Sequence, residues 1–81
     1  MYYVSMVDTF LSGWGRAEGK ISVVVVKCST LSEAEECKEL NDTRSDMKGV
    51  EISKVKPCCY EHPEKYDVEE RDFNPDSRYR F

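Results

Sequence analysis

A glycine-rich loop, residues 12–20, is the segment of the chain best equipped for chemistry, and it reads Ser-Gly-Trp-Gly-Arg-Ala-Glu-Gly-Lys. Gly-x-Gly followed by Gly-Lys is suggestive of a phosphate-binding loop, in which backbone N–H groups and a lysine hold the phosphates. The spacing argues against that interpretation. A Walker loop requires a glycine where Trp14 stands, a Ser or Thr where Ile21 stands, and a helix after the lysine. The kinase pattern fails as well, because Glu18 occupies its third glycine position.

Partner binding is a second interpretation of this loop. Trp14 stands between two glycines and close to Arg16, and tryptophan and arginine dominate the binding energy of protein interfaces. A third interpretation is a structured turn, in which Trp14 packs over a sheet and the glycines supply the turns. The candidate binding residues of the loop are Ser12, Gly13, Trp14, Gly15, Arg16 and Lys20.

The C-terminal third of the chain is acidic. Residues 58–81 hold seven carboxylates against four basic side chains, and the formal net charge of the chain is -4. The chain has no basic stripe, which disfavours nucleic acid as a partner. We favour a solvated edge whose charges protect a strand from pairing. The alternative is a surface that mimics nucleic-acid phosphates and binds a basic groove of a partner, with Glu69 and Glu70 as its candidate residues.

Three potential zinc ligands cluster at Cys58, Cys59 and His62, and Cys28 or Cys37 could complete a set of four. Structural zinc sites usually use Cys-x-x-Cys pairs, and the chain has none. We therefore expect neither a metal nor another cofactor. The cysteines should be free thiols, and Cys37 is better explained as a small core residue.

No constellation of catalytic residues is recognisable. His62 is the single histidine, and nothing in the spacing places it beside Ser12 or a cysteine. Asp8 and Glu18 could form a carboxylate pair, but acids that flank a loop are more often solvated. We therefore expect the protein not to be an enzyme.

The elements that must position the loop begin with two strands, at residues 2–9 and 21–28. The second strand holds four consecutive valines and is apolar on both faces, which is typical of a central strand covered on both sides. One helix can cover only one of those faces. The other face must meet the C-terminal tail or a second copy of the chain, so a homodimer is one of two solutions.

Residues 31–41 are predicted to form the one helix. Thr30 and Glu33 have the spacing of a capping box, in which each side chain satisfies an exposed N–H group at the helix start. An apolar stripe follows at helical spacing and should face the sheet. Its members are Leu31, Ala34, Cys37 and Leu40.

A third strand is predicted at residues 47–56, with Val50, Ile52 and Val55 buried and Pro57 as its end, because proline cannot donate to a strand ladder. Residues 65–81 should form an edge strand around Tyr66 and Val68 or a docking tail.

These elements predict a single α+β domain over residues 1–81. We expect a small two-layer sandwich, with an antiparallel sheet of three or four strands and one helix in the order ββαβ, with or without a further strand. The N-terminus has no signal peptide and no apolar run is long enough to span a membrane, so a cytoplasmic location is expected.

A longer pattern, Asp-x-Phe-x-Ser-Gly-Trp-Gly-x-Ala-x-Gly-Lys over residues 8–20, resembles a group of short, uncharacterised proteins of bacteriophages and gut bacteria. The similarity covers residues 1–57 and includes Arg-Ser-Asp-Met-Lys at 44–48 and Pro57. It implies an accessory protein of a phage or mobile element. Such proteins commonly bind and block host defence enzymes, including CRISPR effectors. The leading hypothesis is therefore a protein-binding inhibitor or adaptor, and the alternative is a small ligand- or nucleic-acid-binding module that uses the loop.

Overall fold

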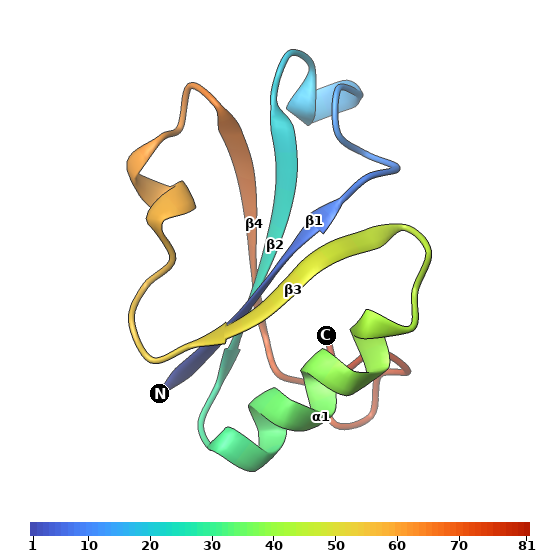
Figure 1. Cartoon of the computed structure of the whole chain (residues 1–81), viewed down its shortest axis with the longest axis vertical. Helices are drawn as coiled ribbons and strands as arrows, with labels where there is room; N and C mark the ends of the chain where they lie inside the picture. Colours follow the sequence, from blue (N-terminus) through green and yellow to red (C-terminus); the bar gives the residue numbers. More distant parts are fainter.

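The computed structural model describes the backbone of residues 1–81 and every side chain except that of Arg16. Its elements are, in chain order, β1 Tyr2–Asp8, a 3-10 helix η1 Gly15–Ala17, β2 Ile21–Cys28, α1 Leu31–Asp42, β3 Met47–Ser53, a 3-10 helix η2 Cys58–Glu61 and β4 Tyr66–Asp72 (Figure 1). The strands form one sheet in the order β3-β1-β2-β4. The predicted α+β class with one helix is confirmed.

The sheet is mixed, so the prediction of a purely antiparallel sheet was wrong. β1 pairs antiparallel with β2 and β3, whereas β4 pairs parallel with β2. The reason lies in the path of residues 54–65, which return the chain to the end of the sheet where β2 begins (Figure 1). A parallel pair needs a long crossover connection of this kind.

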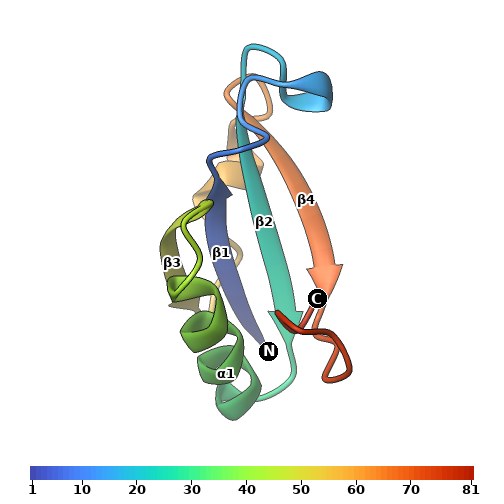
Figure 2. The same ribbon diagram turned by 90° about the vertical axis from the view of Figure 1, so that its right-hand side faces the viewer.

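β2 lies between β1 and β4 and is buried on both faces, as its valines predicted. Val24, Val26 and Cys28 pack in one cluster with Ala34 and Cys37 of α1. We call this side of the sheet the helix face. Figure 2 shows α1 lying across it, low on the sheet.

The opposite side, which we call the second face, is covered in a way that the sequence did not predict. Val23 and Val25 of β2 pack there with Cys59, and Tyr60 joins the same cluster. The 54–65 connection thus covers this face, whereas Phe73 and Phe81 of the tail pack on the helix face. The expectation that the tail or a second copy covers it was wrong, so this face no longer calls for a homodimer.

α1 begins as predicted. Thr30 Oγ1 accepts a hydrogen bond from the N–H of Glu33 at 3.2 Å, and the Glu33 carboxylate accepts one from the N–H of Ser29 at 2.9 Å. Together they satisfy two backbone donors near the helix start. Ala34 and Cys37 of the predicted stripe are buried, but Leu31 is exposed and Leu40 is only half-buried.

β3 is shorter than predicted, because it ends at Ser53 and not next to Pro57. The hydroxyl of Ser53 donates to the carbonyl of Val55 at 2.8 Å and accepts from its N–H at 3.1 Å, which turns the chain out of the sheet. Val50 is buried, as expected, whereas Ile52 is only half-buried. Val55 is 71% exposed, so the prediction of its burial was wrong.

The C-terminal residues are tied to α1. The buried side-chain amide of Asn41 donates to the carbonyls of Cys37 at 2.8 Å and Tyr79 at 3.1 Å. The Arg44 guanidinium lies 4.2 Å from the centre of the Tyr79 ring. Residues 66–72 are therefore the expected edge strand, and the residues that follow dock on the helix.

Replacing Asn41 with alanine should lower the free energy of unfolding by about 1–3 kcal/mol, because the carbonyl of Tyr79 would lose the amide donor that ties the tail to α1. Urea denaturation measures this change. The control is Glu39→Ala at an exposed position of α1, which should change the stability by less than about 0.5 kcal/mol. Equal effects of the two substitutions would contradict the docking of the tail through Asn41.

Candidate functional site

The loop of residues 9–20 joins β1 to β2 and projects from one end of the sheet (Figure 2). Its entry is fixed by Asp8, the last residue of β1, whose side chain is buried. The Oδ1 atom of Asp8 accepts hydrogen bonds from the N–H groups of Phe10 and Leu11, both at 3.0 Å. An aspartate that binds the backbone two and three residues ahead holds the chain in a turn. Asp8 is therefore a structural residue of the loop and not half of a carboxylate pair.

Ser12 ties the loop to both strands. Its Oγ donates to the carbonyl of Asp8 at 2.7 Å and accepts from the N–H of Ser22 at 2.9 Å. The hydroxyl of Ser12 is thus engaged as donor and acceptor. Ala17 of η1 is buried under the loop at 2% exposure.

The glycines beside Trp14 serve the backbone. Gly13 has φ = +82° and Gly15 has φ = +53°, a region that costs other residues about 1–2 kcal/mol. The N–H of Gly13 is shared between the carbonyls of Ala17 at 3.1 Å and Lys20 at 3.0 Å. These glycines let the loop close on itself around its own hydrogen bonds.

Three large apolar side chains point away from this closed backbone. Phe10 is 75% exposed, Leu11 43% and Trp14 73%. We call these three residues the apolar tip. The interpretation in which Trp14 packs over the sheet was wrong, because the hydrogen bonds of the loop hold its backbone clear of the sheet. The loop therefore presents apolar surface to solvent in a fixed arrangement.

The same hydrogen bonds leave little of the backbone for a phosphate. Five N–H groups between residues 13 and 20 already donate to carbonyls inside the loop: those of Gly13, Trp14, Ala17, Glu18 and Lys20. A phosphate cradle needs such groups directed at the ligand. The loop geometry therefore does not favour the ligand-binding interpretation.

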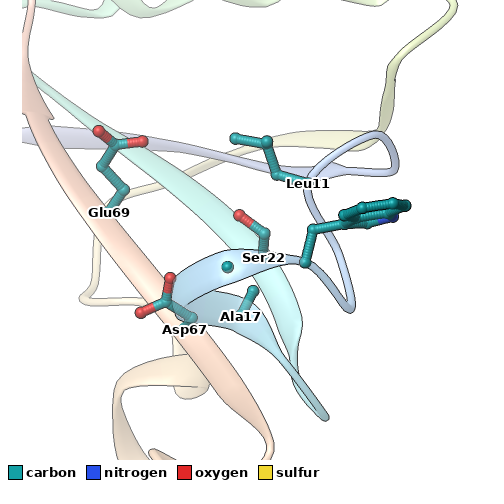
Figure 3. A pocket seen from close by; sticks show the side chains of 7 residues that line it. Leu11, Ala17, Ser22, Asp67 and Glu69 are labelled. Carbon is teal, nitrogen blue, oxygen red and sulfur yellow. The ribbon is translucent and has the colours of Figure 1, made fainter.

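A groove of about 390 Å³ separates the apolar tip from β4 (Figure 3). Figure 3 shows Leu11 on one side of it, Asp67 and Glu69 of β4 on the other, and the small side chains of Ser22 and Ala17 between them. The groove thus joins apolar surface to two carboxylates. Its lining residues are Leu11, Trp14, Gly15, Ala17, Ser22, Asp67 and Glu69.

The two candidate glutamates are placed apart, because successive residues of a strand point to opposite faces. Glu69 lines the groove and accepts a hydrogen bond from Arg71 at 2.7 Å. Glu70 lies on the second face, where it accepts from the Tyr60 hydroxyl at 2.7 Å and pairs with Lys27 at 2.9 Å. The hydrogen bond from Tyr60, followed by that from Lys27, lowers the pKa of Glu70. The structure therefore does not bring Glu69 and Glu70 into one row of phosphate-like charges.

The structure places the predicted binding residues of the loop in different surroundings. Ser12, Gly13, Trp14 and Gly15 are in the loop described above. The side chain of Arg16 lies outside the described part of the structure, and Lys20 is half-buried where the loop meets β2. Phe10 and Leu11 are surface residues that were not among the candidates predicted from the sequence. Asp8 could have indicated their exposure, because it is a turn-forming residue and stands between the strand and these two side chains.

The sheet separates the proposed zinc ligands. Cys28 and Cys37 lie in the core of the helix face, where burial raises their pKa values to about 11 and about 12. Cys59 packs on the second face, and burial raises its pKa too. No group of three or more His, Cys, Asp or Glu side chains suited to a metal occurs among the described residues.

The loop conformation can be tested at Asp8. Asp8→Ala removes the acceptor of two N–H groups and should destabilise the protein by about 1 kcal/mol, as the loss of a capping side chain typically does. It should also speed amide hydrogen exchange at Phe10 and Leu11. Asp8→Asn keeps an Oδ1 acceptor and should retain most of the stability and most of the protection of these two amides from exchange. A loop that responds identically to the two substitutions would contradict the assigned role.

Comparison with protein families, with curated proteins and with solved structures gave no match. No helix in the described part of the chain is long and apolar enough to cross a bilayer. The case for a function therefore depends on the geometry of the loop, the groove and the strand beside them.

Proposed function

We propose that this protein works by binding another protein through the apolar tip of Phe10, Leu11 and Trp14. One observation carries the proposal: one loop exposes three large apolar side chains while its backbone is held by its own hydrogen bonds. Leu11 and Trp14 line the same groove, and contiguous exposed apolar surface of this kind marks interaction sites. Transfer of this surface from water to a partner is favourable, and a loop that is already ordered loses little entropy on binding.

The groove beside the tip supports a protein partner with mixed chemistry. Its carboxylates, Asp67 and Glu69, lie across from Leu11. An apolar centre bordered by charged groups is the usual composition of an interface. A partner with apolar residues next to basic ones would complement this surface.

A binding role without catalysis agrees with the site. The Ser12 hydroxyl is occupied by backbone partners, and His62 Nδ1 lies 3.6 Å from the carboxylate of Glu64 in an exposed segment. Neither arrangement resembles an activated nucleophile. We therefore propose a protein that acts by occupying a partner's surface.

The resemblance of residues 1–57 to short bacteriophage and gut-bacterial proteins supports an accessory role in a phage or mobile element, inside the host cell. Blocking a host defence enzyme such as a CRISPR effector is the form of that role that we propose. The alternative is a module that binds a small ligand or nucleic acid through the loop. The loop geometry does not favour it, because five N–H groups between residues 13 and 20 are already bonded to carbonyls of the loop.

Trp14→Ala should weaken partner binding by at least about thirtyfold, the factor expected for loss of a hot spot worth about 2 kcal/mol. The tagged protein would be purified from a nuclease-treated lysate of the expressing host, the captured partner identified, and its Kd measured for each variant. The melting temperature should hardly change, since Trp14 is exposed.

Val55→Ala is the matched control, because Val55 is equally exposed but lies in the 54–65 connection, outside the apolar tip. It should bind the partner like the unchanged protein. Equal binding by Trp14→Ala and the unchanged protein would contradict the proposal. Binding of the purified protein to an added nucleic acid, with an affinity that falls steeply with salt, would favour the alternative module.

A further inference from the structure

β4 forms an outer edge of the sheet (Figure 2). Its residues Asp67 and Glu69 line the groove. Two hydrogen bonds define how its backbone is oriented: the N–H of Ile21 donates to Lys65 O, and the N–H of Phe73 donates to Lys27 O, both at 2.9 Å. Along a strand in a parallel ladder, alternate residues bond to the neighbour. The odd-numbered residues 65–73 therefore face β2, and the even-numbered ones turn their N–H and C=O groups outward.

Three residues supply this outward row. The N–H of Tyr66 is used locally, since it donates to His62 O at 3.0 Å. Val68, Glu70 and Asp72 follow, and no backbone group of the described residues pairs with their outward N–H groups. Rows of this kind are where an extended segment of another chain adds to a sheet.

The charges of β4 select among the segments that could add. The strand carries four carboxylates, Asp67, Glu69, Glu70 and Asp72, against the single base Arg71. Side chains directly opposite each other across a strand pair interact strongly, and like charges there are destabilising. Two copies of β4 would bring together two strands that each carry four acids and one base, and their net negative charges would repel each other. The edge therefore disfavours a second copy and suits a basic segment.

We propose that the outer edge of β4 receives an extended, basic segment of the partner protein as an added strand. This inference rests on the proposed function, because the groove beside the apolar tip ends on Asp67 and Glu69 of β4 and makes tip and edge one surface. The residues on each face of β4 determine which residue types the segment should carry beside them. Lys or Arg belongs beside Glu69 on the helix face, and an apolar residue beside Val68 on the second face.

The test begins with a library of random 12-residue peptides selected on the immobilised protein. The bound peptides should alternate Lys or Arg with apolar residues. Residue-resolved amide exchange on the complex should then slow at least tenfold at Val68, Glu70 and Asp72. It should change little at Glu69 and Arg71, whose N–H groups face β2.

Two variants test the edge directly. Val68→Pro removes an outward N–H and should reduce peptide binding at least tenfold while the ladder to β2 stays intact. Should Val68→Pro prevent folding, the double variant Asp67→Asn with Glu69→Gln provides the test, with an expected loss of binding of at least fivefold. Asp76→Asn, an exposed acid in the tail, is the matched control and should bind normally.

The outcomes separate the two proposals. Peptides whose binding is weakened by Trp14→Ala but unchanged by the β4 variants would overturn the added strand and support the apolar tip. Peptides whose binding is weakened by the β4 variants but unchanged by Trp14→Ala would overturn the role of the apolar tip. Selected peptides without basic residues, slowed exchange confined to other amides, or light scattering that shows a dimer paired through β4 would each overturn the basic segment. A selection that yields no peptide would overturn both proposals.

Discussion

An apolar strand with two faces to bury governs the arrangement of this molecule. β2 places Val24 and Val26 on one side of the sheet and Val23 and Val25 on the other, and all four are buried. Each face of a small sheet must be covered by a different segment. The chain achieves this with two crossings, α1 over the helix face and residues 54–65 over the second face. The second crossing also explains why β4 returns parallel to β2.

The two crossings leave the β1–β2 loop outside both hydrophobic clusters. With no layer over it, the loop has to satisfy its backbone internally, and it does so through the carboxylate of Asp8, the hydroxyl of Ser12 and turns at glycines. Its residues thus divide into those that hold the backbone and those that face solvent. The second group, the apolar tip, contributes little to the fold. Its side chains are therefore available to bind a partner.

The strands and the helix could largely be predicted because their signals are local. The valine run predicted β2 over its observed length, and the spacing of Thr30 and Glu33 predicted where α1 begins. The direction of β4 could not be predicted in this way, because it depends on the path of the distant 54–65 connection. Val55 was misassigned for a related reason: a serine side chain, Ser53, ends the strand before it.

The candidate site was partly visible in the sequence. The glycine pattern located the loop, but whether Trp14 is buried depends on hydrogen bonds between Asp8, Ser12 and Ser22, which residue types alone do not specify. The separation of Glu69 from Glu70 followed from strand alternation and could have been predicted once that segment was assigned to an edge strand.

The proposed binding role requires the loop to be ordered before any partner binds, and backbone ¹⁵N relaxation of the free protein measures this order. If the internal hydrogen bonds hold the loop, the order parameters of residues 9–20 should be about 0.85, like those of the strands on either side. Values below about 0.6 at Phe10, Leu11 and Trp14 would rule out an ordered loop, and the apolar tip would then have no fixed arrangement for a partner to bind.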